Sequence, residues 1–125
     1  MRNFAAGFVA AALLAGCGGG SSDGGSVTTL RCLFVDDMCQ EITAVMTASQ
    51  QATLGTSCTN GGGAYAVGNC PTAGAVAGHC YYTGTTVLGG AIAGATANEY
   101  YYSAGWTLTA AQTYCALPPA GTWVP

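Results

Sequence analysis

The chain has 125 residues, with only two basic and five acidic side chains and a formal net charge of −3. A domain with so few cations cannot neutralise a row of phosphates, which excludes nucleic acid as a partner. The same shortage excludes electrostatic attraction to anionic lipid headgroups. The length allows one domain with one modest hydrophobic core.

The first predicted element is a targeting segment. The stretch "FAAGFVAAALL", which follows Asn3, carries no charge. It is too short to cross a bilayer core, which takes about 20 helical residues. It does suit the apolar region of a secretory signal peptide. We therefore expect residues 1–16 to be a signal peptide.

The residues before the predicted cleavage point carry a second signal. Leu14, Ala15, Gly16 and Cys17 resemble the lipobox of bacterial lipoproteins. This resemblance implies that Cys17 becomes the acylated N-terminus and holds the protein to a membrane of the bacterial cell envelope. Glycine rather than aspartate at position 18 favours the outer membrane. The alternative is an ordinary cleaved signal peptide with a coincidental cysteine.

A glycine- and serine-rich stretch comes next. The sequence "GGGSSDGGS" follows Cys17 directly, and linkers of this composition behave as flexible coils. We expect residues 17–26 to comprise the lipidated cysteine and a flexible tether. The globular domain is then expected over residues 27–125.

Six cysteines remain in this predicted domain, and an even number in a small exported domain indicates three disulfides. The alternative is a metal site, but the sequence has no C-x₂-C pair and only one histidine. We expect neither a metal nor a cofactor. The cysteines are Cys32, Cys39, Cys58, Cys70, Cys80 and Cys115.

The domain divides into two halves that can be aligned with each other. Each half opens with a cysteine in a β-prone run, turns back into a second such run, passes through a Thr/Ala/Gln stretch and ends in Gly-Ala-Tyr or Gly-Thr-Trp. This pattern predicts an α+β fold of two β-hairpin–helix–strand halves. The alternative is that any alanine- and cysteine-rich chain aligns with itself in this way.

Local signals place the turns and the helices. Asp36 and Asp37 indicate the tip of the first hairpin, whereas the connection over residues 83–98 is long and expected to be mobile. Thr47 and Thr109, each followed three residues later by glutamine, match the capping box that begins a helix. We expect short amphipathic helices after both threonines.

The repeat selects one of the fifteen disulfide connectivities. Cys32 aligns with Cys80 and Cys58 with Cys115, so each half is expected to carry the same bridge. The rival pattern joins neighbours, Cys32 to Cys39 and Cys58 to Cys70, and closes shorter loops, which remove less entropy from the unfolded chain. The expected bridges are Cys32–Cys58, Cys80–Cys115 and, from the remaining pair, Cys39–Cys70.

Features between Cys58 and Val124 are similar to those of a group of short, uncharacterised bacterial lipoproteins rich in cysteine. They are a Cys-Pro step at Cys70, a Gly-x-Cys ending at Cys80, tyrosines at 100–102 and a terminal Gly-Thr-Trp starting at Gly121. The resemblance implies an envelope lipoprotein and no particular activity.

Tyrosines are the candidate binding residues. We expect those on the two β-prone runs of the second half to form an aromatic face, since exposed tyrosines suit protein or glycan recognition. The alternative is cross-strand stabilisation of the sheet. The candidate residues are Tyr81, Tyr82, Tyr100 and Tyr102.

No set of nucleophile, base and acid emerges from the sequence. His79 is the only histidine, and its neighbour Cys80 is expected to be oxidised. Glu41 and Glu99 form a candidate carboxylate pair at matching places of the two halves, but solvent-facing strand positions explain them more simply. The sequence predicts a non-catalytic envelope lipoprotein that is structural or protein-binding, with glycan or peptidoglycan binding as the alternative.

Overall fold

The computed structural model describes residues 25–125, so the predicted signal peptide, Cys17 and most of the predicted tether lie outside the described residues. The described part contains six strands, two α-helices and two short 3₁₀ helices. In chain order they are β1 (Ser26–Phe34), β2 (Met38–Met46), α2 (Ala48–Asn60), β3 (Ala64–Val67), β4 (His79–Thr83), η1 (Gly84–Thr86), η2 (Leu88–Gly90), β5 (Thr96–Tyr101), α3 (Leu108–Cys115) and β6 (Thr122–Val124).

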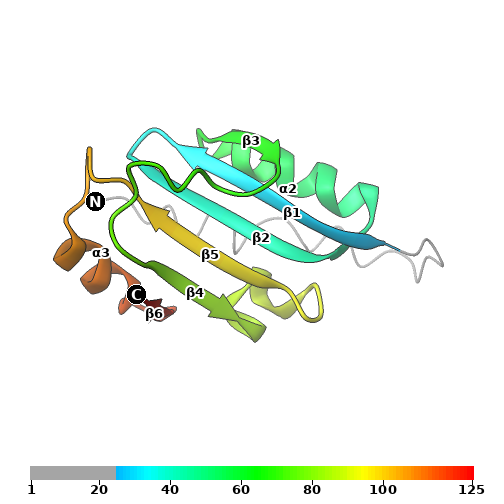
Figure 1. Ribbon diagram of the computed structural model, residues 1–125. Helices are drawn as coiled ribbons and strands as arrows, with labels where there is room; N and C mark the ends of the chain where they lie inside the picture. The colour runs from blue at the N-terminus through cyan, green and yellow to red at the C-terminus, as the bar shows by residue number, and fades with distance from the viewer. Residues whose placement is uncertain (1–24) are drawn as a thin grey trace.

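All six strands form one antiparallel sheet in the order β3-β1-β2-β5-β4-β6 (Figure 1). The mixed strand-and-helix fold expected from the sequence is confirmed. The order reads the same from either edge: a short strand after a helix, the first strand of a hairpin, then its second strand. The two hairpins meet at the centre of the sheet, where β2 pairs with β5.

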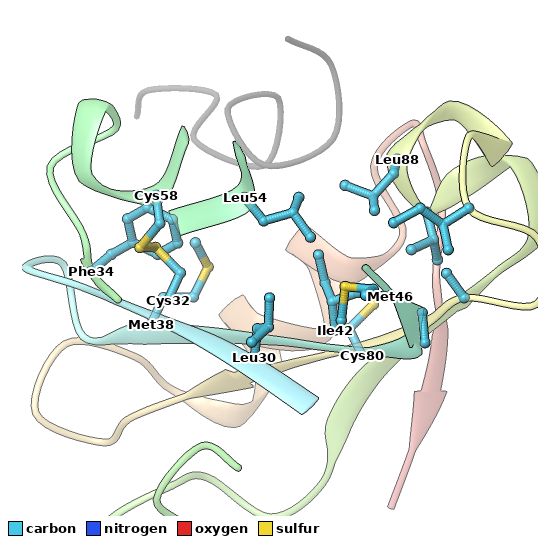
Figure 2. Packing of buried hydrophobic residues seen from close by; sticks show 14 of the residues in the cluster. Leu30, Cys32, Phe34, Met38, Ile42, Met46, Leu54, Cys58, Cys80 and Leu88 are labelled. Carbon is cyan, nitrogen blue, oxygen red and sulfur yellow. A yellow bond between two sulfur atoms is a disulfide. The ribbon is translucent and has the colours of Figure 1, made fainter. Parts of the chain in front are cut away.

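Residue alternation along the strands separates the sheet into an inner and an outer face. Leu30 of β1 and Ile42 of β2 point toward Leu54 of α2 and Leu88 of η2 on the inner face (Figure 2), and all four are buried. Both helices contribute to this same core, since Leu54 of α2 and Ala111 of α3 are fully buried in it.

The helix starts follow the expected chemistry, with one correction. Thr47 caps α2: its hydroxyl accepts from the Gln50 N–H, and the Gln50 side chain accepts from the Thr47 N–H, so the predicted capping box is confirmed. The residue that caps α3 is Thr107 and not Thr109. The prediction for Thr109 is wrong because Thr107 is extended and Leu108 is already helical.

The six cysteines pair in the arrangement that the aligned halves favour: Cys32–Cys58, Cys39–Cys70 and Cys80–Cys115. The first and third bridges each join the opening strand of a hairpin to the following helix on the inner face. Gly63 and Gly121 run past these two bridges so closely that a Cβ on either residue would lie 2.3 Å from a bridge sulfur.

The hairpin connections differ. Residues 35–37 make a tight turn at which Asp37 has a φ of 60°, and the tip predicted at Asp36 and Asp37 is confirmed. Residues 84–95 fold into η1 and η2, and bury Val87, Leu88 and Ile92 in the core. The connection is long, as expected, and these three aliphatic side chains attach it to the core.

The outer face is partly covered by the segment that links the two halves. Residues 68–78 cross over the sheet from β3 to β4 (Figure 1). Cys70 ties this crossover to Cys39 of β2, and the Tyr102 hydroxyl donates to the Pro71 carbonyl at 2.7 Å. A small second core of Cys39, Cys70 and Tyr102 lies beneath it.

Candidate functional site

The expected aromatic face does not form as one surface. Tyr81 and Tyr100 lie on the outer face and are half-buried, but Tyr82 points to the inner face and packs against the main core. Tyr102 is buried beneath the crossover. The prediction for Tyr82 and Tyr102 is wrong, because strand alternation turns Tyr82 inward and residues 68–78 cover Tyr102.

The two outward tyrosines differ in their surroundings. Tyr100 stacks on His79 of the neighbouring strand, with ring centroids 5.1 Å apart and planes at 27°. Together they line an open hollow of about 190 Å³, whose other lining residues are Thr72, Ala75, Val76, Gly78 and Pro125. The hollow therefore combines an aromatic wall, an imidazole and backbone groups of the crossover.

Glu41 is a buried carboxylate behind this hollow. Its Oε2 accepts from the Cys70 N–H at 2.8 Å, and its Oε1 accepts from Asn98 Nδ2 at 2.9 Å and from the Tyr100 hydroxyl at 3.4 Å. Burial and the nearby carboxylate together raise the pKa of Tyr100, so its hydroxyl stays a donor. Glu41 thus fixes both the crossover and the Tyr100 ring that lines the hollow.

The expectation that Glu41 and Glu99 face solvent is wrong. Glu41 is 4% exposed and Glu99 is 1% exposed. They do not form a carboxylate pair either, because Glu41 lies on the outer face and Glu99 on the inner face. The crossover covers the first and the core packing covers the second. The residue opposite Glu99 across the centre of the sheet is Gln40.

Glu99 lies at the centre of the inner face, and no cationic side chain of residues 25–125 lies beside it. Gln40 Nε2 donates to its Oε2 and the Tyr101 hydroxyl donates to its Oε1. Burial raises the pKa of Glu99 above its ordinary value, and these two donors offset only part of that effect. Burial and the neighbouring Glu99 carboxylate likewise raise the pKa of Tyr101.

A small apolar cavity adjoins this carboxylate. It measures about 30 Å³, which is room for about one water molecule. Its lining includes Gln40, Glu99, Tyr82, Val87 and Leu88. On the other side of Tyr101, the rings of Trp106, Tyr114 and Trp123 pack against its ring with centroids 4.9–6.1 Å away. The cavity is therefore a packing feature, too small for an organic ligand.

The histidine has no catalytic surroundings among residues 25–125. His79 makes no hydrogen bond there to a hydroxyl or a carboxylate, and Cys80 is tied to Cys115. Within the same residues, no three His, Cys, Asp or Glu side chains come together in a way that could hold a metal ion. None of the described helices is long and apolar enough to cross a membrane.

In comparisons with protein-family models, with curated proteins and with solved structures, nothing matches this chain.

Sequence reasoning singled out both glutamates but missed their burial, although a signal was present for Glu99. Alternation places Glu99 on the same face as Tyr101, and Gln40 on the same face as Met38 and Ile42. A polar pair among such apolar neighbours indicates a buried polar contact. The signal for Glu41 was absent, because the segment that covers it lies about thirty residues further along the chain.

Proposed function

We propose that this chain is a non-catalytic lipoprotein of the bacterial cell envelope, anchored in the outer membrane through acylated Cys17, whose domain binds another envelope protein or serves as a structural surface component. The observation that carries the proposal is the combination of a lipobox-like sequence with a domain stapled by three disulfides. Disulfides of this kind persist in oxidising compartments outside the cytoplasm.

The chemistry of the domain supports a binding or structural role. The chain's single imidazole stacks on Tyr100, and the adjacent cysteine is committed to a bridge. The buried carboxylates Glu41 and Glu99 are taken up by hydrogen bonds that hold the fold together. The outer face of the sheet and its hollow offer a surface for a partner.

The anchor is tested on protein isolated from bacterial membranes. We expect mass spectrometry to find an N-terminal Cys17 carrying acyl chains, and the other six cysteines oxidised. Cys17→Ala should abolish the modification and release the domain from the membrane fraction, because one cysteine carries all the chains. An unmodified thiol at position 17, or reduced cysteines elsewhere, would overturn the proposal.

The membrane assignment has its own matched variant. Gly18→Asp keeps the acylated cysteine but changes the residue that favours the outer membrane. We expect the parent protein in the outer-membrane fraction of a density gradient and the variant in the inner-membrane fraction. The same distribution for both proteins would contradict the outer-membrane assignment while leaving the anchor intact.

The hollow favours a second candidate function, which is glycan or peptidoglycan binding. Tyr100 and His79 offer a stacked aromatic wall beside polar backbone groups, and sugars bind well to rings that combine an apolar face with a polar edge. A glycan array run beside crosslinking in intact cells separates the two functions. Tyr100→Ala should abolish glycan binding, whereas Tyr81→Ala, outside the hollow, should preserve it.

We also propose that the two halves of the domain are an internal repeat. The support is the palindromic strand order, the matching bridges and the matching approach of Gly63 and Gly121 to those bridges. On this reading Gln40 and Glu99 occupy the same place in the two halves and meet at the pseudo-twofold axis.

A further inference from the structure

One end of the sheet is distinguished by where the chain enters it. β1 begins at Ser26 beside the end of β2 at Met46, and the end of β4 at Thr83 pairs with the start of β5 at Thr96. The connection over residues 84–95 lies at this same end, on the right in Figure 1. We call these segments the Ser26 end. The opposite end carries the 35–37 turn and the hollow beside His79.

Within residues 25–125, the segments of the Ser26 end carry no ionic side chain. Residues 42–98 contain no Asp, Glu, Lys or Arg, and neither do residues 25–30. Among the described residues, the charged side chains that are not buried are Arg31, Asp36 and Asp37. Asp36 and Asp37 lie in the turn at the opposite end, and Arg31 is held in mid-sheet by the Asn69 carbonyl. The charge of the domain is thus displaced away from the Ser26 end.

The exposed apolar side chains of the Ser26 end have no ionic neighbour in these segments, whereas the exposed Val35 of the opposite turn is followed directly by Asp36 and Asp37. Val27 and Val45 face each other on neighbouring strands of the outer face, and are 73% and 54% exposed. At the same end of the sheet, the exposed residues of the 84–95 connection are glycines, alanines and a threonine. The next row across the outer face consists of Thr29, Thr43, Thr96 and Thr83, one on each of four adjacent strands.

The sequence limits how far this end can lie from the predicted anchor. Ser26 lies nine positions after Cys17, and a chain of that length spans at most about 32 Å when fully extended. β1 is itself about 30 Å long at the usual rise of a strand. The opposite end of the sheet can therefore lie about 30 Å further from the anchor than the Ser26 end does. Such a short connection also raises the effective concentration of bilayer surface at the Ser26 end, and a weak contact is then sufficient.

We infer that the Ser26 end rests on the surface of the lipid bilayer, with Val27, Val45 and the 84–95 connection against the headgroup and acyl boundary. This inference rests on the proposed anchor at Cys17. A surface free of ionic groups loses little solvation when it enters that boundary, and threonine hydroxyls next to it can bond to headgroups. The hollow beside His79 and Tyr100 then faces away from the membrane, where a partner can reach it.

The inference is tested with tryptophans placed at the two ends of the full-length acylated protein. Val45→Trp and Val27→Trp report on the Ser26 end, and Val35→Trp, at a valine 95% exposed in the opposite turn, is the matched control. The proteins are reconstituted into phosphatidylcholine vesicles with plain or brominated acyl chains. The unsubstituted protein gives the background from Trp106 and Trp123.

We expect brominated lipid to remove most of the emission that Val45→Trp and Val27→Trp add, and none of the emission that Val35→Trp adds. Equal quenching at both ends, or none at either end in protein that floats with the vesicles, overturns the inference and leaves the anchor standing. An emission from position 45 that is shielded from water but insensitive to bromine assigns the patch to a protein partner or a second copy, and also overturns it. Acylated protein that fails to float with vesicles overturns the anchor and the inference together.

Discussion

The two hairpin–helix–strand units, Ser26–Val67 and His79–Val124, follow the same plan with different side chains. In each unit the opening strand is bridged to the helix, and the returning short strand pairs with the opening strand at the edge of the sheet. The bridge and the glycine beside it are the features that the units share most closely. The disulfide between the opening strand and the helix is therefore more characteristic of this arrangement than any particular core residue.

The filling of the units differs. The first unit packs Leu54 of a thirteen-residue helix against aliphatic strand residues, whereas the second has Ala111 on an eight-residue helix. The second unit compensates with the aliphatic side chains of the 84–95 connection and with the rings around Tyr101. A shorter helix with a smaller core residue is tolerated because a longer hairpin connection folds back over the gap.

The units also differ where they meet. The residue two positions after Glu99 is Tyr101, whose hydroxyl donates to the carboxylate, while the residue two positions after Gln40 is Ile42, which has no hydroxyl. On the inner face, only the second unit places a hydroxyl donor beside the position of the buried carboxyl group. The polar pair at the centre of the sheet is asymmetric, although the strand order on its two sides is the same.

The largest expected effect comes from removing a bridge. Replacing Cys32 and Cys58 together by alanine, or Cys80 and Cys115 together, should lower the free energy of unfolding by about 3–4 kcal/mol in either unit, because each bridge closes a loop in the unfolded chain. The sequence separations are 26 and 35, and loop entropy grows only with the logarithm of length. Urea denaturation measures both costs, with the Cys39 and Cys70 double variant as the reference. A large loss of stability in one unit and none in the other would show that the two bridges are not equivalent.

The glycines beside the bridges give the next largest effect. Gly63→Ala and Gly121→Ala each place a Cβ far inside contact distance of a bridge sulfur, and such overpacking costs about 1–3 kcal/mol. We expect similar losses of thermal stability in both units. Gly61→Ala, whose Cβ would have contacts no closer than 3.4 Å, is the control and should have little effect. If Gly63→Ala were as harmless as Gly61→Ala, the tight approach would not be required by the fold.

The smallest effects are those at the central polar pair, and they depend on pH. Because burial raises the pKa of Glu99 in the folded protein, the folded state binds more protons, and stability is greatest in acid and falls as pH rises through that pKa. The fall is at most about 1.4 kcal/mol per pH unit, the limit for one proton. Glu99→Gln should remove this dependence and stabilise the protein at neutral pH.

Moving the carboxyl group to the first unit tests whether the Tyr101 hydroxyl makes the second unit the better place for it. The exchange Gln40→Glu with Glu99→Gln should leave the protein less stable than the parent at neutral pH, because Ile42 cannot donate to a carboxylate at position 40. Gln40→Glu alone sets two carboxyl groups side by side and should steepen the loss with rising pH. Denaturation at several pH values measures the free energy of unfolding of these two variants and of Glu99→Gln. Equal pH profiles for the parent and the exchanged protein would show that Tyr101 does not favour one unit over the other.

The disulfides, the start of the first helix and the tight turn could be predicted from the sequence. The alignment of the halves led to the three bridges found in the structure, Thr47 and Gln50 fixed the start of α2, and Asp36 and Asp37 marked the tight turn. These features depend on residues that are close in sequence or on a repeated spacing. The start of α3 was misplaced by two residues because Thr109 matches the capping box with Gln112, whereas the actual cap, Thr107, has Ala110 three residues later.

The placement of the polar and aromatic side chains depended on the tertiary structure. Alternation states that Tyr81 and Tyr82 face opposite ways, but which face is covered depends on the helices and on residues 68–78 crossing the sheet. That crossover buries Tyr102 and Glu41 and leaves Tyr100 beside a hollow.

The absence of lysine and the concentration of charge in a few residues are properties of the amino-acid sequence. The cysteine framework and the strand and helix content could be predicted from it. The pairing of β2 with β5, which sets Gln40 against Glu99, is known only from the folded structure. The same is true of the gathering of the uncharged segments at the Ser26 end. The physical reason is that local propensity and spacing act within one element. The choice of which elements meet is made by long-range packing and hydrogen bonding, in which a residue's neighbours come from distant parts of the chain.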